Sequence, residues 1–202
     1  MATHPRVHAE VPPIVGIGAS AGGISPLREI LSALDASLPA AILIVLHMDP
    51  NHTSVLADIL GRATSLPVRQ ASMGAPIEAG HVLIAPPDHH LLATAEGSVV
   101  LSQEPRVHFV RPSVDVLFTS IAAVSSRRGV GVVLSGGGID GATGVRAIKA
   151  AGGIVIAQDE ASSEVFGMPG SAIETGDVGL VLPLDSIPAA IEKVVRERGD
   201  GD

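Results

Sequence analysis

The sequence predicts an α/β fold, a doubly wound and mostly parallel β-sheet with helices on both faces and a small β-hairpin. The first observation is that short apolar runs alternate with segments whose apolar residues recur at helical spacing. The second is composition. Hydrophobic residues make up 46% of the 202 residues, yet tryptophan, tyrosine and cysteine are absent. The core must therefore be mainly aliphatic, as is usual for a parallel sheet that is covered on both faces.

The expected elements follow the chain in order. Strands are expected at residues 13–17, 40–46, 66–70, 81–87, 130–134, 153–158 and 179–182, with a hairpin formed by 91–93 and 99–101. Helices are expected at 24–34, 51–60, 113–126, 145–151, 171–175 and 186–196, the third with Pro112 in its first turn. We interpret residues 1–12 as a flexible tail, 13–196 as one domain and 197–202 as a second tail.

Charge and cysteine content exclude several classes of protein. A formal net charge of −8 argues against nucleic acid or an anionic membrane as the main partner, because both select basic surfaces. No apolar run approaches the length of a membrane-spanning helix. Without cysteine there is neither a disulfide framework nor a thiolate site, so we expect a cytoplasmic protein.

A serine between glycines follows the first expected strand. The segment 18–22, Gly-Ala-Ser-Ala-Gly, matches the G-x-S-x-G turn that exposes a nucleophilic hydroxyl, here Ser20. The backbone N–H of Ala21 then faces a developing oxyanion. The same stretch also satisfies a dinucleotide fingerprint, Gly16-x-Gly18-x-x-Ala21, in which the serine is only a small spacer. A tight turn without chemistry is the third interpretation.

Two further polar side chains stand after strands. His47 ends the second apolar strand, and Asp140 follows the glycine-rich segment after the strand at 130–134. Because the carboxyl ends of parallel strands share one edge of the sheet, Ser20, His47 and Asp140 are expected to meet there as a hydrolytic triad. The order Ser, His, Asp differs from that of the α/β-hydrolases. For Asp140 alone, a helix N-cap is the common alternative.

Two other interpretations are less favoured. The cluster Asp88-His89-His90 contains metal-ligand types, but adjacent histidines on a strand point to opposite faces. A dinucleotide site needs an acidic residue ~20 residues after the glycines. Asp49 lies roughly ten residues too far along the chain for that spacing. We therefore expect neither a metal nor a cofactor.

Several ordered motifs resemble one known family, the CheB-type chemotaxis protein-glutamate methylesterases, over residues 14–194. They are residues 18–23, 47–48, 80–86, 111–118, 136–142, 157–160 and 167–169. The resemblance implies the catalytic domain of an enzyme that hydrolyses methyl esters of glutamates on chemoreceptor helices, and in many members also deamidates glutamines. It implies Ser20 as nucleophile, His47 as general base and Asp140 as the carboxylate that orients the histidine.

Two departures from the family pattern bear on function. Gly137 stands where the family usually has methionine, which affects the shape of the pocket and its oxyanion contacts. The usual members also carry a phosphorylatable receiver domain ahead of the catalytic one, so we expect a separate receiver or kinase-pathway protein as regulator. A non-catalytic docking or sensory module is the alternative function.

A basic rim is the last expectation. Arg106, His108, Arg111, Arg127 and Arg128 are expected to offer local positive charge to acidic receptor helices, despite the acidic total.

Overall fold

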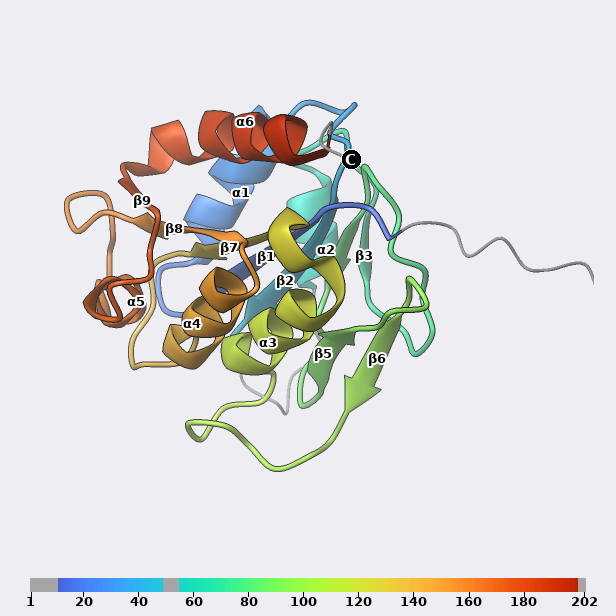
Figure 1. The fold of residues 1–202 in the computed structure, drawn as a ribbon, viewed down its shortest axis with the longest axis horizontal. Coiled ribbons are helices and arrows are strands. Elements are labelled where there is room, and N and C mark those ends of the chain that lie inside the picture. The colour runs from blue at the N-terminus through green and yellow to red at the C-terminus, as the bar shows by residue number, and fades with distance from the viewer. Residues whose placement is uncertain (1–10, 49–54, 200–202) are drawn as a thin grey trace, which may run out of the picture.

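Seven parallel strands form the central sheet of the computed structural model, which describes residues 11–48 and 55–199 (Figure 1). Their order is β3-β4-β2-β1-β7-β8-β9, and a separate antiparallel hairpin pairs β5 with β6. The strands are β1 (Ile14–Ala19), β2 (Ala41–Leu46), β3 (Val68–Gln70), β4 (Val82–Ile84), β5 (His90–Ala93), β6 (Val99–Ser102), β7 (Gly129–Val133), β8 (Ile154–Gln158) and β9 (Leu180–Leu182). The predicted fold class is confirmed.

Six α-helices within the described residues cover the sheet. They are α1 (Ile24–Ala33), α2 (Leu56–Gly61), α3 (Val114–Ser125), α4 (Ala142–Ala150), α5 (Gly167–Glu174) and α6 (Ile187–Gly199). In this part of the chain none is both long and apolar enough to cross a bilayer.

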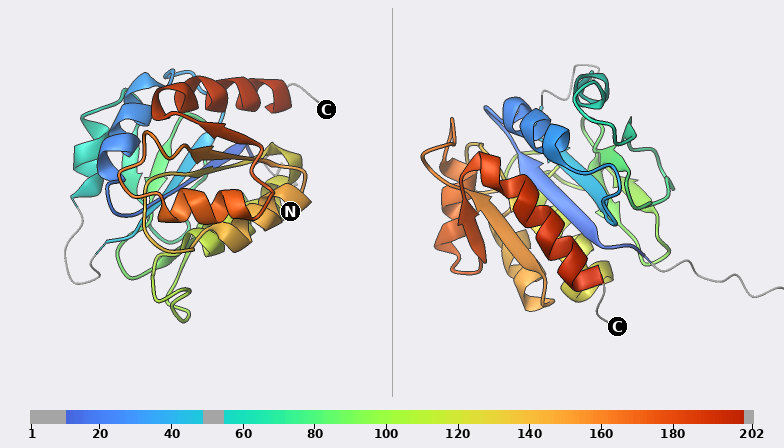
Figure 2. Two further views of the ribbon diagram at one scale, coloured as in Figure 1. Left: turned by 90° about the vertical axis from the view of Figure 1, so that its left-hand side faces the viewer. Right: turned by 90° about the horizontal axis from the view of Figure 1, so that it is seen from above.

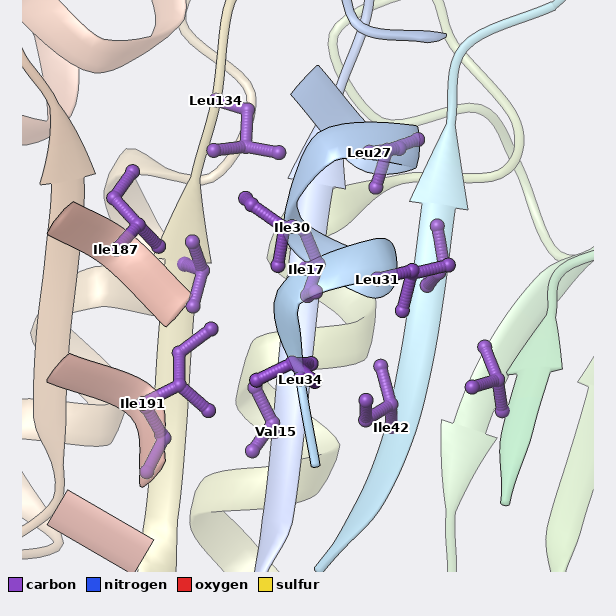
Figure 3. Close-up of a cluster of buried hydrophobic side chains, with 14 of the residues drawn as sticks. Val15, Ile17, Leu27, Ile30, Leu31, Leu34, Ile42, Leu134, Ile187 and Ile191 are labelled. Atoms are coloured by element: carbon purple, nitrogen blue, oxygen red, sulfur yellow. The ribbon is translucent and has the colours of Figure 1, made fainter. Parts of the chain in front are cut away.

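Each face of the sheet has its own hydrophobic core. On one face α1, α2 and α6 cover the sheet, and Figure 2 shows α1 and α6 lying next to each other across it. Figure 3 shows how α1 inserts Leu27, Ile30 and Leu31 between side chains of the neighbouring strands. On the other face α3, α4, α5 and the hairpin bury a second cluster. Strands buried on both faces explain the continuous apolar runs that predicted them.

Several helix boundaries differ from the predicted ones. Pro112 precedes the N-cap of α3, which is Ser113, so the proline is not in the first turn. Helices α4 and α5 each begin several residues earlier than predicted, and α6 runs to Gly199, past the expected end of the domain at residue 196. The early starts of α4 and α5 were not predicted because glycines lie in or next to their first turns, and glycine is a weak helix former. The helix expected at 51–60 is described only from Leu56.

The glycines of β1 are packing positions. Gly16 and Gly18 lie inside the strand with their missing side chains turned toward α3. A Cβ atom on Gly16 would lie 2.5 Å from Ile121, and one on Gly18 would lie 2.6 Å from Cγ2 of Val114. Real Cβ atoms do not approach so closely, so these glycines let α3 lie directly on the centre of the sheet. The dinucleotide interpretation is not needed to explain them.

Replacing Gly18 by alanine is expected to lower the free energy of unfolding by about 1–3 kcal/mol, because the added methyl group must push α3 away from β1. Urea denaturation measures the change. Gly61→Ala is the matched control, since a Cβ there has only Val68 near it, at 3.7 Å. Equal effects of the two substitutions would contradict the packing role of Gly18.

Candidate active site

Three strand ends bring the predicted side chains to one edge of the sheet. Ser20 directly follows β1, His47 directly follows β2, and Asp140 ends the loop after β7. Since β1 pairs in parallel with both β2 and β7, these ends are neighbours. Ser20 and His47 line a common cavity of about 400 Å³, together with the turn 21–25, Leu46, Met48 and Glu164.

His47 and Asp140 are hydrogen-bonded to each other. Nε2 of the histidine lies 2.8 Å from Oδ2 of the aspartate, whose side chain is 3% exposed. Burial by itself raises the pKa of Asp140, but hydrogen bonds from His47, the Val114 N–H and the Ser113 hydroxyl outweigh it and hold the pKa below its usual value. The aspartate is therefore ionised at neutral pH, with the imidazole fixed against it.

The N-terminus of α3 holds the carboxylate of Asp140. Its Oδ1 accepts hydrogen bonds from the Ser113 hydroxyl at 2.7 Å and the Asp115 N–H at 3.1 Å, and its Oδ2 accepts one from the Val114 N–H at 2.6 Å. A helix N-terminus favours a negative charge. Asp140 does not cap its own helix, because the N-cap of α4 is Gly141, which adopts a left-handed φ of 105°. The N-cap alternative for Asp140 is therefore wrong, because its carboxylate binds the start of α3 and not the start of the helix that follows it.

Sequence reasoning missed the second buried carboxylate, that of Asp115. Its Oδ1 accepts hydrogen bonds from the N–H groups of Gly141 and Gly144 at the start of α4. Its Oδ2 lies 3.0 Å from Nε2 of His108. Asp140 thus binds the start of α3 while Asp115, on α3, binds the start of α4. In the sequence, Asp115 is recognisable only as an acidic residue near the start of an expected helix, which does not identify its partners on α4.

His108, Asp115 and Asp140 are the described residues whose grouping could hold a metal ion. Every oxygen of the two carboxylates already accepts a hydrogen bond from a backbone, hydroxyl or imidazole donor. The donor set is thus satisfied without a cation, and nothing in its chemistry requires one.

The turn that carries Ser20 is tied to the loop after β7. The Ser20 N–H donates to the Ser135 carbonyl at 3.0 Å, and the Ser135 hydroxyl donates to the Ala21 carbonyl at 2.9 Å. Among the described residues, none accepts a hydrogen bond from the N–H of Ala21 or of Gly137, the two donors expected for an oxyanion. Both positions are exposed to solvent.

The cluster at residues 88–90 has other partners than a metal. Asp88 accepts hydrogen bonds from Arg111, and His89 lies 2.9 Å from the Pro87 carbonyl through Nδ1. His90 is buried, accepts the Ser113 N–H at Nδ1 and donates from Nε2 to the Pro105 carbonyl. These contacts account for all three side chains as structural groups.

The five basic residues do not form one rim. Arg127 and Arg128 immediately precede β7 and so lie at the amino edge of the sheet, opposite the site. Arg106 and Arg111 line a small cavity with His47. Arg111 is mostly buried and donates to Asp88 and two backbone carbonyls, so its role is structural. Asp49, which the dinucleotide interpretation needs, lies outside the described residues.

A doubly wound sheet with a serine in a tight turn and a histidine paired to a buried aspartate defines the class of α/β proteins with a serine hydrolase-type site. The chain belongs to the CheB methylesterase family, whose model matches residues 15–191. The resemblance stated from the sequence motifs is confirmed.

Relatives and a solved structure support the assignment. A protein-glutamate methylesterase/protein-glutamine glutaminase of Symbiobacterium thermophilum is 46% identical over 184 residues, which is 91% of this chain and 51% of that protein. A second protein with this activity in its name, from Anaeromyxobacter dehalogenans, is 48% identical over 91% of this chain and 53% of its own. The Thermotoga maritima CheB methylesterase catalytic domain superposes with a TM-score of 0.87 at 38% identity, covering 90% of this chain and 98% of that domain. The chain spans about half the length of these curated relatives.

Proposed function

We propose that the chain is a protein-glutamate methylesterase that hydrolyses γ-methyl esters of glutamates on chemoreceptor helices, through Ser20, His47 and Asp140. The observation that carries the proposal is the 2.8 Å pair of His47 with the buried Asp140, next to a cavity that His47 shares with Ser20. The names of the relatives and the family supply the substrate class.

In the first half of the reaction Ser20 Oγ attacks the ester carbonyl. Because Nε2 of His47 carries the proton shared with Asp140, Nδ1 is the nitrogen that takes the serine proton. The same proton then passes to the departing methoxide, which leaves as methanol. The product of this half is an acyl-enzyme, in which the glutamyl carbonyl is bonded to the oxygen of Ser20.

In the second half water attacks the acyl-enzyme. His47 takes a proton from the water and returns it to the oxygen of Ser20, which releases the glutamate γ-carboxylic acid. At neutral pH the acid then loses its proton to the solvent and becomes the carboxylate. Asp140 stays ionised throughout and stabilises the positive charge that develops on the imidazole, as its lowered pKa favours. The N–H groups of Ala21 and Gly137 are the proposed donors to the oxyanion of each tetrahedral intermediate.

A second activity on the same site is glutamine deamidation. The relatives carry this activity in their names, and the acyl-enzyme formed from a glutamine amide is identical to that formed from the ester. In this reaction ammonia leaves in place of methanol. We expect the chain to act in the cytoplasm.

Release of methanol from a methylated chemoreceptor fragment tests the proposed function. The wild-type chain should release methanol and leave the fragment lighter by one methylene group for each ester cleaved, as read by mass spectrometry. A folded wild-type chain that binds the fragment but releases no methanol would instead support the alternative of a non-catalytic docking module.

The two neighbouring glycines of the loop after β7 make a matched pair of variants. A Cβ on Gly136 would lie 2.8 Å from the Cβ of Ser20 and closer still to the sulfur of Met168, so Gly136→Ala is expected to displace the serine and lower kcat by about 100-fold. A Cβ on Gly137 has only Val165 near it, at 4.0 Å. Gly137→Ala should therefore leave folding unchanged and keep kcat within a few-fold of the wild-type value. The methionine that is usual at this position in the family agrees with room for a side chain. Comparable losses in both variants would contradict this steric argument.

A further inference from the structure

A tight turn beside the site presents an exposed aromatic ring. The turn 107–110 lies between β6 and α3, in the segment that Figure 1 shows projecting beyond the hairpin. Val107 and Val110 exchange backbone hydrogen bonds of 3.2 and 3.0 Å. Between them His108 and Phe109 adopt left-handed φ angles of 49° and 66°. Phe109 is 94% exposed, although the chain has only three phenylalanines.

The turn is fixed to the rest of the molecule from both sides. On one side the His108 ring contacts the carboxylate of Asp115 on α3. On the other, Arg111 donates to Asp88 at 2.8 Å and to the carbonyls of Gln103 and Glu104 at 2.8 and 3.0 Å. Backbone strain of this kind persists only where the surroundings hold it, and it is concentrated at functional sites.

The position of the turn connects it to the candidate site. Phe109 and Val110 line a small cavity with His47 and Met48. Val107 and His108, at the other end of the turn, line an apolar groove of about 430 Å³ against α3. A partner that crosses the turn therefore contacts both hollows, which suits an extended macromolecule better than a small ligand.

The charge around the turn favours an acidic partner. Asp88 is the carboxylate shared by two guanidinium groups, those of Arg111 at 2.8 Å and Arg106 at 3.8 Å. Arg111 holds Asp88 much more closely than Arg106 does, so the guanidinium of Arg106, which is about half exposed, is the more accessible of the two to a partner. A cation beside an exposed aromatic ring complements a helix that presents an apolar stripe and carboxylates.

We propose that Phe109, with Arg106, is the docking point for the helix of the substrate protein, and that it positions the methylated side chain at Ser20. The inference rests on the proposed function and names the part of the chain that recognises the protein around the ester. An exposed aromatic side chain that enters a partner surface is the usual anchor of such contacts. Arg106 adds electrostatic attraction that salt screens.

The test compares two substrates, a methylated chemoreceptor fragment and a short blocked peptide that contains one glutamate γ-methyl ester. Phe109→Ala should raise KM for the receptor fragment by tenfold or more and leave kcat/KM for the peptide unchanged. Phe109→Trp, which keeps a large apolar ring, should retain the wild-type KM. Arg106→Gln should raise KM for the fragment at low salt and match the wild type at high salt.

Val181→Ala is the matched control, because Val181 is also an exposed apolar side chain but lies in edge strand β9. An unchanged KM of Phe109→Ala for the fragment would overturn the inference, and so would equal losses on fragment and peptide. Failure of the proposed function looks different, since the wild-type chain then releases no methanol from either substrate.

Discussion

Replacement of Ser20 by alanine is expected to lower methanol release by at least about 10⁴-fold, since Ser20 is the proposed nucleophile that forms the acyl-enzyme. His47→Ala should cost about as much, because the two side chains act as one unit. The double variant should lose little more than either single variant. Initial rates with a methylated receptor fragment measure all three.

The controls exclude unfolding as the cause. The side chain of Ser20 makes no hydrogen bond with another described residue, so Ser20→Ala should keep the wild-type urea midpoint. It should also still bind the fragment. Residual turnover within tenfold of the wild type would show that another nucleophile is used.

Asp140→Asn is expected to lower kcat by about 10³–10⁴-fold and also to destabilise the fold. The substituted amide must turn its NH₂ group toward donors in either orientation, because both carboxylate oxygens accept backbone N–H groups. One buried N–H group is then left unpaired, at a cost of about 1–3 kcal/mol. Urea denaturation and single-turnover kinetics separate the two effects.

The stability difference between wild type and Asp140→Asn should depend on pH. The folded state holds the pKa of Asp140 below 3.8, the ordinary value of an aspartate, so the ionised carboxylate stabilises the fold above that pH. This contribution is lost as the pH falls through the lowered pKa. The difference in unfolding free energy should therefore be full at pH 6 and shrink below pH 3.8. A difference that stays constant with pH would contradict the role of the charge.

The fold was predictable because its strands are buried on both faces. Continuous apolar runs such as Ile42–Leu46 are typical of strands in a parallel sheet that is covered on both faces. The positions of Ser20, His47 and Asp140 at one edge then follow from strand direction alone. The helix starts at Ala142 and Gly167 were not predictable from periodicity, since glycines and short loops there are fixed by contacts with distant strands.

Contacts between distant segments account for what the sequence did not reveal. Nothing local to Asp115 says that its carboxylate will bind the start of α4, 26 residues along the chain. Arginine is usually a surface residue, so the sequence suggests an exposed side chain at Arg111. Its structural role depends on Asp88, which comes close to it only in the folded chain. Arg127 and Arg128, by contrast, directly precede the predicted strand at 130–134, so strand direction alone already places them at the edge opposite the site.

The exchange of carboxylates between α3 and α4 predicts which site residues a family member would keep if it lost its activity. Asp140 and Asp115 together fasten the two helices, so a protein under selection for folding alone keeps both. Ser20 is held through its backbone N–H, so its side chain has no comparable role in stabilising the fold. An aspartate at position 140 is therefore expected wherever this scaffold is intact, and under the proposed function the serine is the residue that distinguishes an active esterase from an inactive relative.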